Sequence, residues 1–149
     1  MMNTMKAFSV GLAVVLLGVG AGAAAEEAVD AASLYELTSD GTSAKLKTGE
    51  AGRLVIEIRA KGGAHISDEA PLRVQLKSAA LKLSNESLGL KDSTAKKVEG
   101  SFPNPRFEVP FTAAEKGAAS VEASLSFFVC TEKLCSRQQK SLSVPITVL

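Results

Sequence analysis

The chain has 149 residues, with 17 basic and 16 acidic side chains, one histidine and two cysteines. This length suits one domain, and the even charge argues against a nucleic-acid or acidic-membrane partner, because both leave a basic excess in the sequence. One histidine and two cysteines are too few for a self-contained zinc cluster, which needs about four ligands.

Residues 1–25 have the features of a secretory signal peptide. Lys6 is the only charged residue before Glu26, an apolar stretch follows at residues 10–20, and small residues lead to Ala25. A basic start, a short apolar core and a small-x-small end are typical of such peptides. We therefore expect cleavage after Ala25 and export to the periplasm, with secretion or an uncleaved membrane anchor as alternatives; the apolar run is short for a membrane span.

The mature chain is predicted to begin with a flexible leader at residues 26–33, which are alanine-rich and acidic, followed by one domain at residues 34–149. In this domain apolar and polar residues alternate. Leu54, Ile56 and Ile58, for example, share a face, as expected for strands with one side in a core and the other in water. The predicted strands are residues 34–37, 44–47, 53–60, 72–77, 81–83, 107–111, 121–129 and 142–148.

Turn-forming residues separate these strands, and no helix longer than a turn or two is indicated. The turns are predicted at residues 39–41, 49–52, 61–63, 101–105 and 115–117. Short strands at this spacing predict an all-β fold, namely an immunoglobulin-like antiparallel β-sandwich. Phe107 and Phe111 are expected in its core.

The two cysteines flank a loop of hairpin length, residues 131–134, between two strong strand patterns. Outside the cytoplasm, cysteines this close in sequence are normally oxidised, so we expect a disulfide between Cys130 and Cys135. With the cysteines facing each other across the hairpin, Val121 lies opposite Val144 and the apolar faces match. A shift of one residue would place leucines opposite serines.

The same register predicts that the cystine lies on the outer face of the sheet, near the hairpin tip. Closing a six-residue loop stabilises a fold by only about 2 kcal/mol, against roughly 4 or more for a loop near a hundred residues. This placement favours an accessible redox site. Lys133, Arg137 and Lys140 would favour a thiolate by their charge, and Glu132 opposes that effect. The competing hypothesis is a structural cystine, the usual role of close cysteine pairs in secreted domains.

Two segments resemble a known family. Residues 127–135 read Phe-Phe-Val-Cys-Thr-Glu-Lys-Leu-Cys, and after a polar step residues 142–146 read Leu-Ser-Val-Pro-Ile. Upstream, residues 62–72 read Gly-Gly-Ala-His-Ile-Ser-Asp-Glu-Ala-Pro-Leu. These segments resemble the N-terminal periplasmic domain of DsbD, the thiol:disulfide interchange protein family. The resemblance covers residues 46–149 and is specific at these places.

The resemblance implies an immunoglobulin-like sandwich in which Cys130 and Cys135 are the redox couple. In that family the pair receives reducing equivalents from a membrane-embedded thiol reductase and passes them by thiol–disulfide exchange to periplasmic proteins, thioredoxin-like proteins among them. Such a chain would act as a protein-disulfide reductase. Arg137 favours Cys135 as the cysteine of the mixed disulfide. The family also shields its cysteines with a cap loop that carries an aromatic residue, and Phe102 in loop 101–105 is one candidate.

Weaker candidates lie around the single histidine. His65, Cys130 and Cys135 together would suit copper or zinc, but export disfavours free thiolates and no fourth ligand is marked. We therefore expect no metal and no cofactor. Asp68 and Glu69 are candidate general acids, although carboxylates in turns are usually solvated and catalytically idle.

Two hypotheses follow for the function. In the first, the chain is a periplasmic thiol–disulfide exchange module that acts through Cys130 and Cys135, with a membrane thiol reductase and thioredoxin-like proteins as partners. In the second, it is a non-catalytic secreted β-sandwich for binding or assembly, with a structural disulfide. Neither hypothesis includes a nucleic-acid partner or stable insertion into a membrane.

Overall fold

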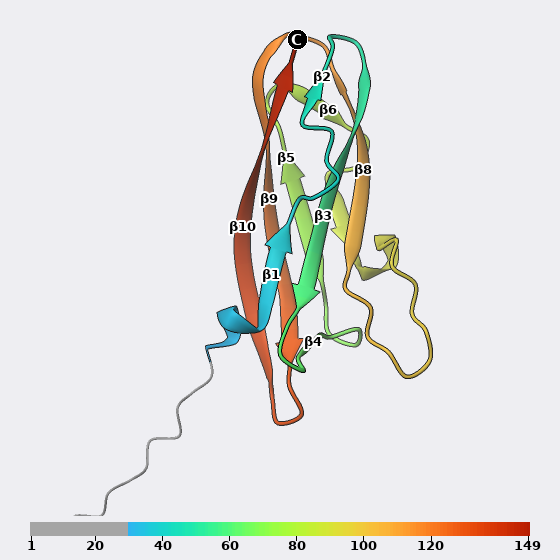
Figure 1. The fold of residues 1–149 in the computed structure, drawn as a ribbon, viewed down its shortest axis with the longest axis vertical. Coiled ribbons are helices and arrows are strands. Elements are labelled where there is room, and N and C mark those ends of the chain that lie inside the picture. The colour runs from blue at the N-terminus through green and yellow to red at the C-terminus, as the bar shows by residue number, and fades with distance from the viewer. Residues whose placement is uncertain (1–29) are drawn as a thin grey trace, which may run out of the picture.

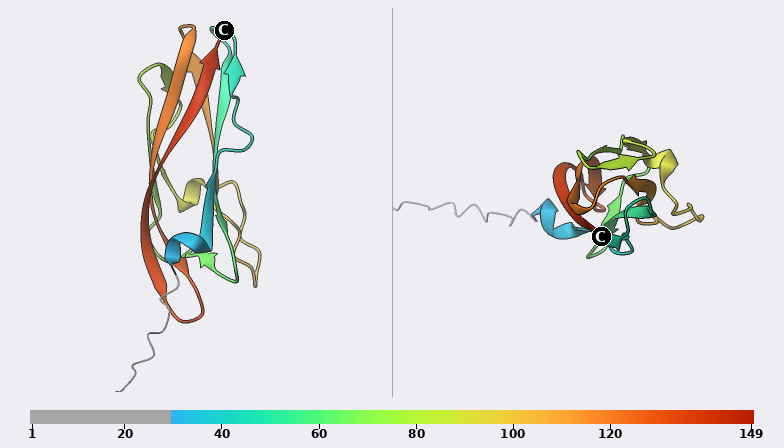
Figure 2. Two further views of the ribbon diagram at one scale, coloured as in Figure 1. Left: turned by 60° about the vertical axis from the view of Figure 1, so that its left-hand side comes forward. Right: turned by 90° about the horizontal axis from the view of Figure 1, so that it is seen from above.

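The computed structural model describes residues 30–149, so the predicted signal peptide at residues 1–25 lies outside the described residues. Two β-sheets pack face to face (Figure 1 and Figure 2), which confirms the predicted immunoglobulin-like β-sandwich. The part of the chain that the structure describes contains two short 3₁₀ helices, η1 (Ala31–Leu34) and η2 (Leu90–Asp92). None of its helices is long and apolar enough to cross a membrane.

Ten strands form the two sheets. They are β1 (Tyr35–Thr38), β2 (Lys45–Leu46), β3 (Ala51–Ala60), β4 (His65–Ile66), β5 (Arg73–Lys77), β6 (Leu81–Leu83), β7 (Ser87–Gly89), β8 (Arg106–Ala113), β9 (Gly117–Cys130) and β10 (Cys135–Val148). The first sheet has the order β1-β3-β8-β6, and the second has the order β2-β10-β9-β5-β7, with β4 also paired to β9. The pairing of β2 with β10 is parallel, so the predicted antiparallel sandwich contains one parallel contact.

The core lies between the sheets and consists of the alternate residues that point inward. Leu54, Ile56 and Ile58 of β3 are buried on one face, as the sequence pattern predicts. Phe107 and Phe111 of β8 are each 1% exposed, which confirms their predicted place in the core. Burying a side chain of this size stabilises the fold by about 1.5–3 kcal/mol, so these inward rows hold the sheets together.

The pairing of β9 with β10 has the predicted register. Val121 lies opposite Val144, and Cys130 lies opposite Cys135. Both strands have 14 residues and are longer than predicted. The extra length of β10 is polar, for example at Ser136 and Ser141, and backbone pairing with β9 maintains it without an apolar alternation.

The first described residues are ordered. The Asp30 carboxylate accepts a hydrogen bond from the Ala32 N–H at 3.1 Å and caps η1. Ala31 and Leu34 pack against the core. The stretch 26–33, predicted to be a flexible leader, therefore ends in a capped 3₁₀ turn, and residues 26–29 lie outside the described part of the chain.

Gly52 is required by close packing across β3 and β8. It lies opposite Phe111 in the register, and a Cβ atom at position 52 would come within 2.5 Å of the Phe111 ring. We predict that Gly52→Ala lowers the free energy of unfolding by about 1–3 kcal/mol, because an overpacked site must shift its neighbours. Urea denaturation measures this loss.

Gly89→Ala is the matched control. The nearest atom to a Cβ at position 89 is the Leu72 carbonyl oxygen at 3.7 Å, an ordinary contact, and its φ of −125° is accessible to alanine. A loss at position 89 as large as the loss at position 52 would contradict the packing explanation.

Candidate functional site

The two cysteines form a disulfide at the closed end of the β9–β10 hairpin. The Thr131 N–H donates to the Leu134 carbonyl at 2.9 Å, which closes the turn between them. The Thr131 hydroxyl also accepts hydrogen bonds from the N–H groups of Lys133 and Leu134, at 3.3 and 3.4 Å. The hydrogen bonds of Thr131 therefore stabilise the turn, and the turn places the two cysteines opposite each other.

The two cysteines differ in exposure. Cys135 is exposed, whereas Cys130 is only 3% exposed. The expectation of an accessible pair is therefore correct for Cys135 and wrong for Cys130. The reason is β4, which pairs with β9 at this level and places His65 beside Cys130 on the outer face of the sheet.

Phe102 lies over His65. The two rings stack with their centroids 4.0 Å apart and their planes 21° apart. Phe102 itself is 51% exposed, so it covers His65 from the solvent side. The structure thus brings Phe102, His65 and Cys130 together, which sequence spacing alone does not show. The one sequence feature that pointed to Phe102 as a shielding residue is its place as the single aromatic of the proline-rich loop 101–105.

We call residues 93–105, which join η2 to β8, the cap segment. Its first residue is anchored by hydrogen bonds: the Ser93 hydroxyl accepts from the Arg106 and Ala95 N–H groups, at 3.0 and 3.3 Å. Near its far end, the Asn104 side-chain oxygen accepts from the Ala60 N–H at 3.0 Å. Both ends of the cap segment are therefore fixed to the sandwich, and Phe102 extends from a loop with anchored ends.

An ion pair ties the middle of the cap segment to the turn after β4. Lys97 donates to the Asp68 carboxylate. This hydrogen bond lowers the pKa of Asp68 and raises the pKa of Lys97. Asp68 thus has a tethering contact, and the neighbouring Glu69 is exposed. The weaker candidate role of these two carboxylates as general acids has no geometric support in this arrangement.

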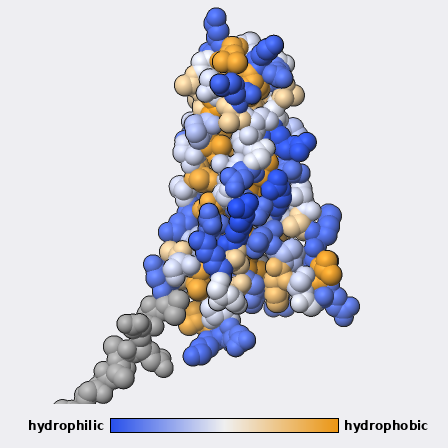
Figure 3. Space-filling view, viewed as in Figure 1, coloured by the Kyte–Doolittle hydropathy of each residue, from blue (hydrophilic) through white to orange (hydrophobic). Residues whose placement is uncertain are grey.

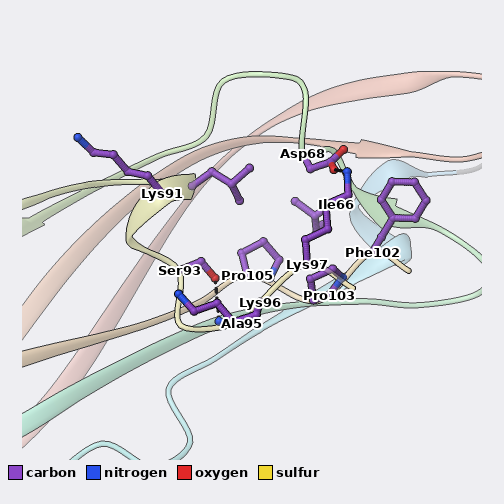
Figure 4. A pocket seen from close by; sticks show the side chains of 11 residues that line it. Ile66, Asp68, Lys91, Ser93, Ala95, Lys96, Lys97, Phe102, Pro103 and Pro105 are labelled. Atoms are coloured by element: carbon purple, nitrogen blue, oxygen red, sulfur yellow. Dashed lines mark hydrogen bonds and ion pairs between the residues drawn. The ribbon is translucent and has the colours of Figure 1, made fainter. Parts of the chain in front are cut away.

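A pocket of about 390 Å³ lies beneath the cap segment (Figure 4). Ile66, Leu90 and Pro105 line it with apolar groups, and Lys91, Lys96 and Lys97 line it with charged ones. In Figure 4, Phe102 and Asp68 lie on one side of the pocket and Lys91 on the other.

The cystine end also carries most of the exposed large apolar side chains. Of the four in residues 30–149, Val98 and Phe102 are in the cap segment and Leu134 is in the hairpin turn. The hairpin turn, β4 and the cap segment lie at one end of the sandwich, and the C-terminus lies at the other (Figure 1). Over the face shown in Figure 3, hydrophobic side chains are scattered among hydrophilic ones. Of these three side chains, Phe102 also lines the pocket.

The disulfide removes the two thiolates that the alternative copper or zinc site would need. Both sulfurs are bonded to each other, so neither is a thiolate that could bind copper or zinc. Among residues 30–149, no group of three or more His, Cys, Asp or Glu side chains is placed to hold a metal ion.

Comparison with known proteins yields only distant likenesses. No protein-family model matches the chain, and no curated protein matches it. A conjugative transposon lipoprotein from Bacteroides eggerthii aligns at a TM-score of 0.41 with 13% identity, over 76% of this chain and 96% of that one.

Two further solved structures align at a similar level. Domains 4 and 5 of the S-layer protein SbsC give a TM-score of 0.41 with 12% identity, over 77% of this chain and 52% of that one. A lipoprotein from Bacteroides thetaiotaomicron gives 0.40 with 15% identity, over 73% and 77% of the two chains. Likeness at this level carries no functional argument, so the function is argued from the site.

We predict that Phe102→Ala speeds reduction of the folded protein's disulfide by dithiothreitol about threefold or more, because losing the ring stacked on His65 opens a route to the buried Cys130. The rate is measured by alkylating samples with iodoacetamide at successive times and counting the modified cysteines by mass spectrometry. Val98→Ala is the control, since Val98 is 65% exposed in the same segment. Equal rates in Phe102→Ala and wild type would contradict a shielding role.

The Asp68–Lys97 ion pair predicts a pH dependence of the cap segment. Because the pKa of Asp68 is lowered in the folded protein, the pair stabilises the segment above the unfolded carboxyl pKa of about 4 and is lost as pH falls through the lower folded value. Hydrogen exchange in residues 93–105, corrected for intrinsic rates, should lose protection there. Asp68→Asn should show this loss already at neutral pH, and Glu69→Gln should not; an unchanged Asp68→Asn would contradict the tether.

Proposed function

We propose that this chain is an exported β-sandwich module for binding or assembly, in which the Cys130–Cys135 bond is structural. The observation that carries the proposal is the burial of Cys130, whose sulfur is bonded to Cys135 at the closed end of a fully paired hairpin. With one cysteine buried and the other exposed, this disulfide holds the hairpin turn closed beside His65.

The pocket beneath the cap segment supports a binding role at the same end. Its lining is mixed: Ile66, Leu90 and Pro105 are apolar, and lysines, among them Lys91 and Lys96, add positive charge. Such a recess suits an apolar side chain of a partner protein that carries negative charge nearby. The cystine then holds one wall of the binding end in place.

The reduction potential of the cystine tests this function. We predict that the folded wild-type protein stays oxidised across a glutathione series, with a potential below about −300 mV, as structural bridges do. Quantifying free thiols at equilibrium measures it. Cys130→Ser combined with Cys135→Ser should lower the free energy of unfolding by about 2 kcal/mol, the value for a six-residue loop, and keep the fold. A potential near that of the glutathione pool would overturn the structural assignment.

Thiol–disulfide exchange is the second candidate, and the unequal exposure of the two cysteines favours it. A partner thiolate could attack the Sγ of Cys135, the exposed cysteine, forming a mixed disulfide while the Cys130 sulfur leaves as a thiolate. A second thiol of the partner would then displace Cys135, so that the partner is oxidised and this chain is reduced by two electrons. The resemblance to DsbD suggests a membrane thiol reductase and periplasmic thioredoxin-like proteins as the two partners. The same glutathione series separates the candidates, because exchange requires a readily reducible cystine.

A further inference from the structure

The outer face of the second sheet has a cationic cleft next to the cystine. Arg73 of β5 lies opposite Ser126 of β9, and Phe128 of β9 lies opposite Arg137 of β10. Paired residues on neighbouring strands point to the same side of a sheet. The two arginines therefore flank β9 from opposite sides, and together with Pro71 they line a cleft of about 390 Å³.

Neither arginine of this cleft is neutralised by the described part of the chain. Within residues 30–149, the ion pairs involve other basic residues, and neither Arg73 nor Arg137 has a carboxylate partner. The nearest acidic residue on the same rows of β9 is Glu122, which lies beyond Ser124 and accepts a hydrogen bond from the Ser143 hydroxyl at 2.7 Å. The outward positions of β5, β9 and β10 between Ser126 and the cystine therefore carry two arginines and no carboxylate, which favours an anion there.

A second cleft continues the first along the same three strands, away from the cystine. It shares Arg73 and Ser126 with the first and has a volume of about 350 Å³. Its other polar lining consists of serine hydroxyls and glutamine amides, from Ser124, Ser141, Gln75 and Gln139. Hydroxyls and amides can hydrogen-bond to both the N–H and C=O groups of a peptide backbone.

We propose that these adjoining clefts bind an extended acidic segment of a partner protein, with one of its carboxylates held between Arg73 and Arg137. A guanidinium offers two parallel donors that match a carboxylate, which a lysine does not. Half-buried Phe128 gives the aliphatic part of the acidic side chain an apolar surface. The joined clefts span three strands, which is more length than a single small carboxylate fills. The inference rests on the proposed binding function and names its partner chemistry.

The test is an NMR titration of the oxidised full-length mature chain with hexaglutamate, following backbone amides and the Nε–H groups of the arginines. We expect shifts at Arg73, Ser126, Phe128 and Arg137. Arg73→Gln and Arg137→Gln should each weaken binding about fivefold, the size expected for one exposed ion pair. Arg53→Gln is the matched control, because Arg53 is an exposed arginine on the other sheet and its loss changes the net charge equally.

Hexaglutamine and inorganic phosphate, at matched ionic strength, are the comparison probes. Weaker binding of both supports recognition of carboxylates on a peptide. Phosphate binding to the same residues as tightly as hexaglutamate, or an equal loss in Arg53→Gln, would overturn the inference. If hexaglutamate bound elsewhere on the chain, the assignment of this cleft as the binding site would be wrong, but the proposed binding function would still stand. A readily reduced cystine would overturn the structural function and leave the cleft result intact.

Discussion

The antiparallel register of β9 and β10 is the constraint on which the rest of the molecule depends. It runs from Gly117 opposite Val148 to Cys130 opposite Cys135 without a break. Because side chains alternate across a strand, this one register places Val121 and Val144 in the core and the cystine on the outer face. It also leaves β9 free on its other side to pair with β5 and β4, which brings in Arg73 and His65.

Much of the sandwich was predictable from the sequence, because its strands obey a local rule. The alternation at Leu54, Ile56 and Ile58, and the match of Val121 with Val144, follow from one face being in a core and the other in water. The hairpin and the disulfide were predictable for the same reason, since both lie within a few residues of each other along the chain. The strands β4 and β7 were missed, although β2 and β6, which are equally short, were predicted.

The surroundings of the cystine were not predictable, because they depend on contacts between distant segments. Phe102 reaches His65 through a loop whose ends are held by Ser93 and Asn104. Nothing in the local pattern of the cap segment indicates those anchors. The burial of Cys130 follows from this packing, so an argument from register alone predicted exposure. The pairing of Asp68 with Lys97 is a contact of the same kind.

The short reach of β2 has a consequence for solubility. β2 pairs with β10 only at Thr147 and Val148, so within residues 30–149 most of the outer edge of β10 has no neighbouring strand. Such an edge can template stacking of one molecule on the next. Here Arg137 and Lys140 place charge along it, and Pro145 interrupts its row of N–H donors. These charges and the proline thus oppose edge-to-edge stacking of the β9–β10 hairpin into fibres.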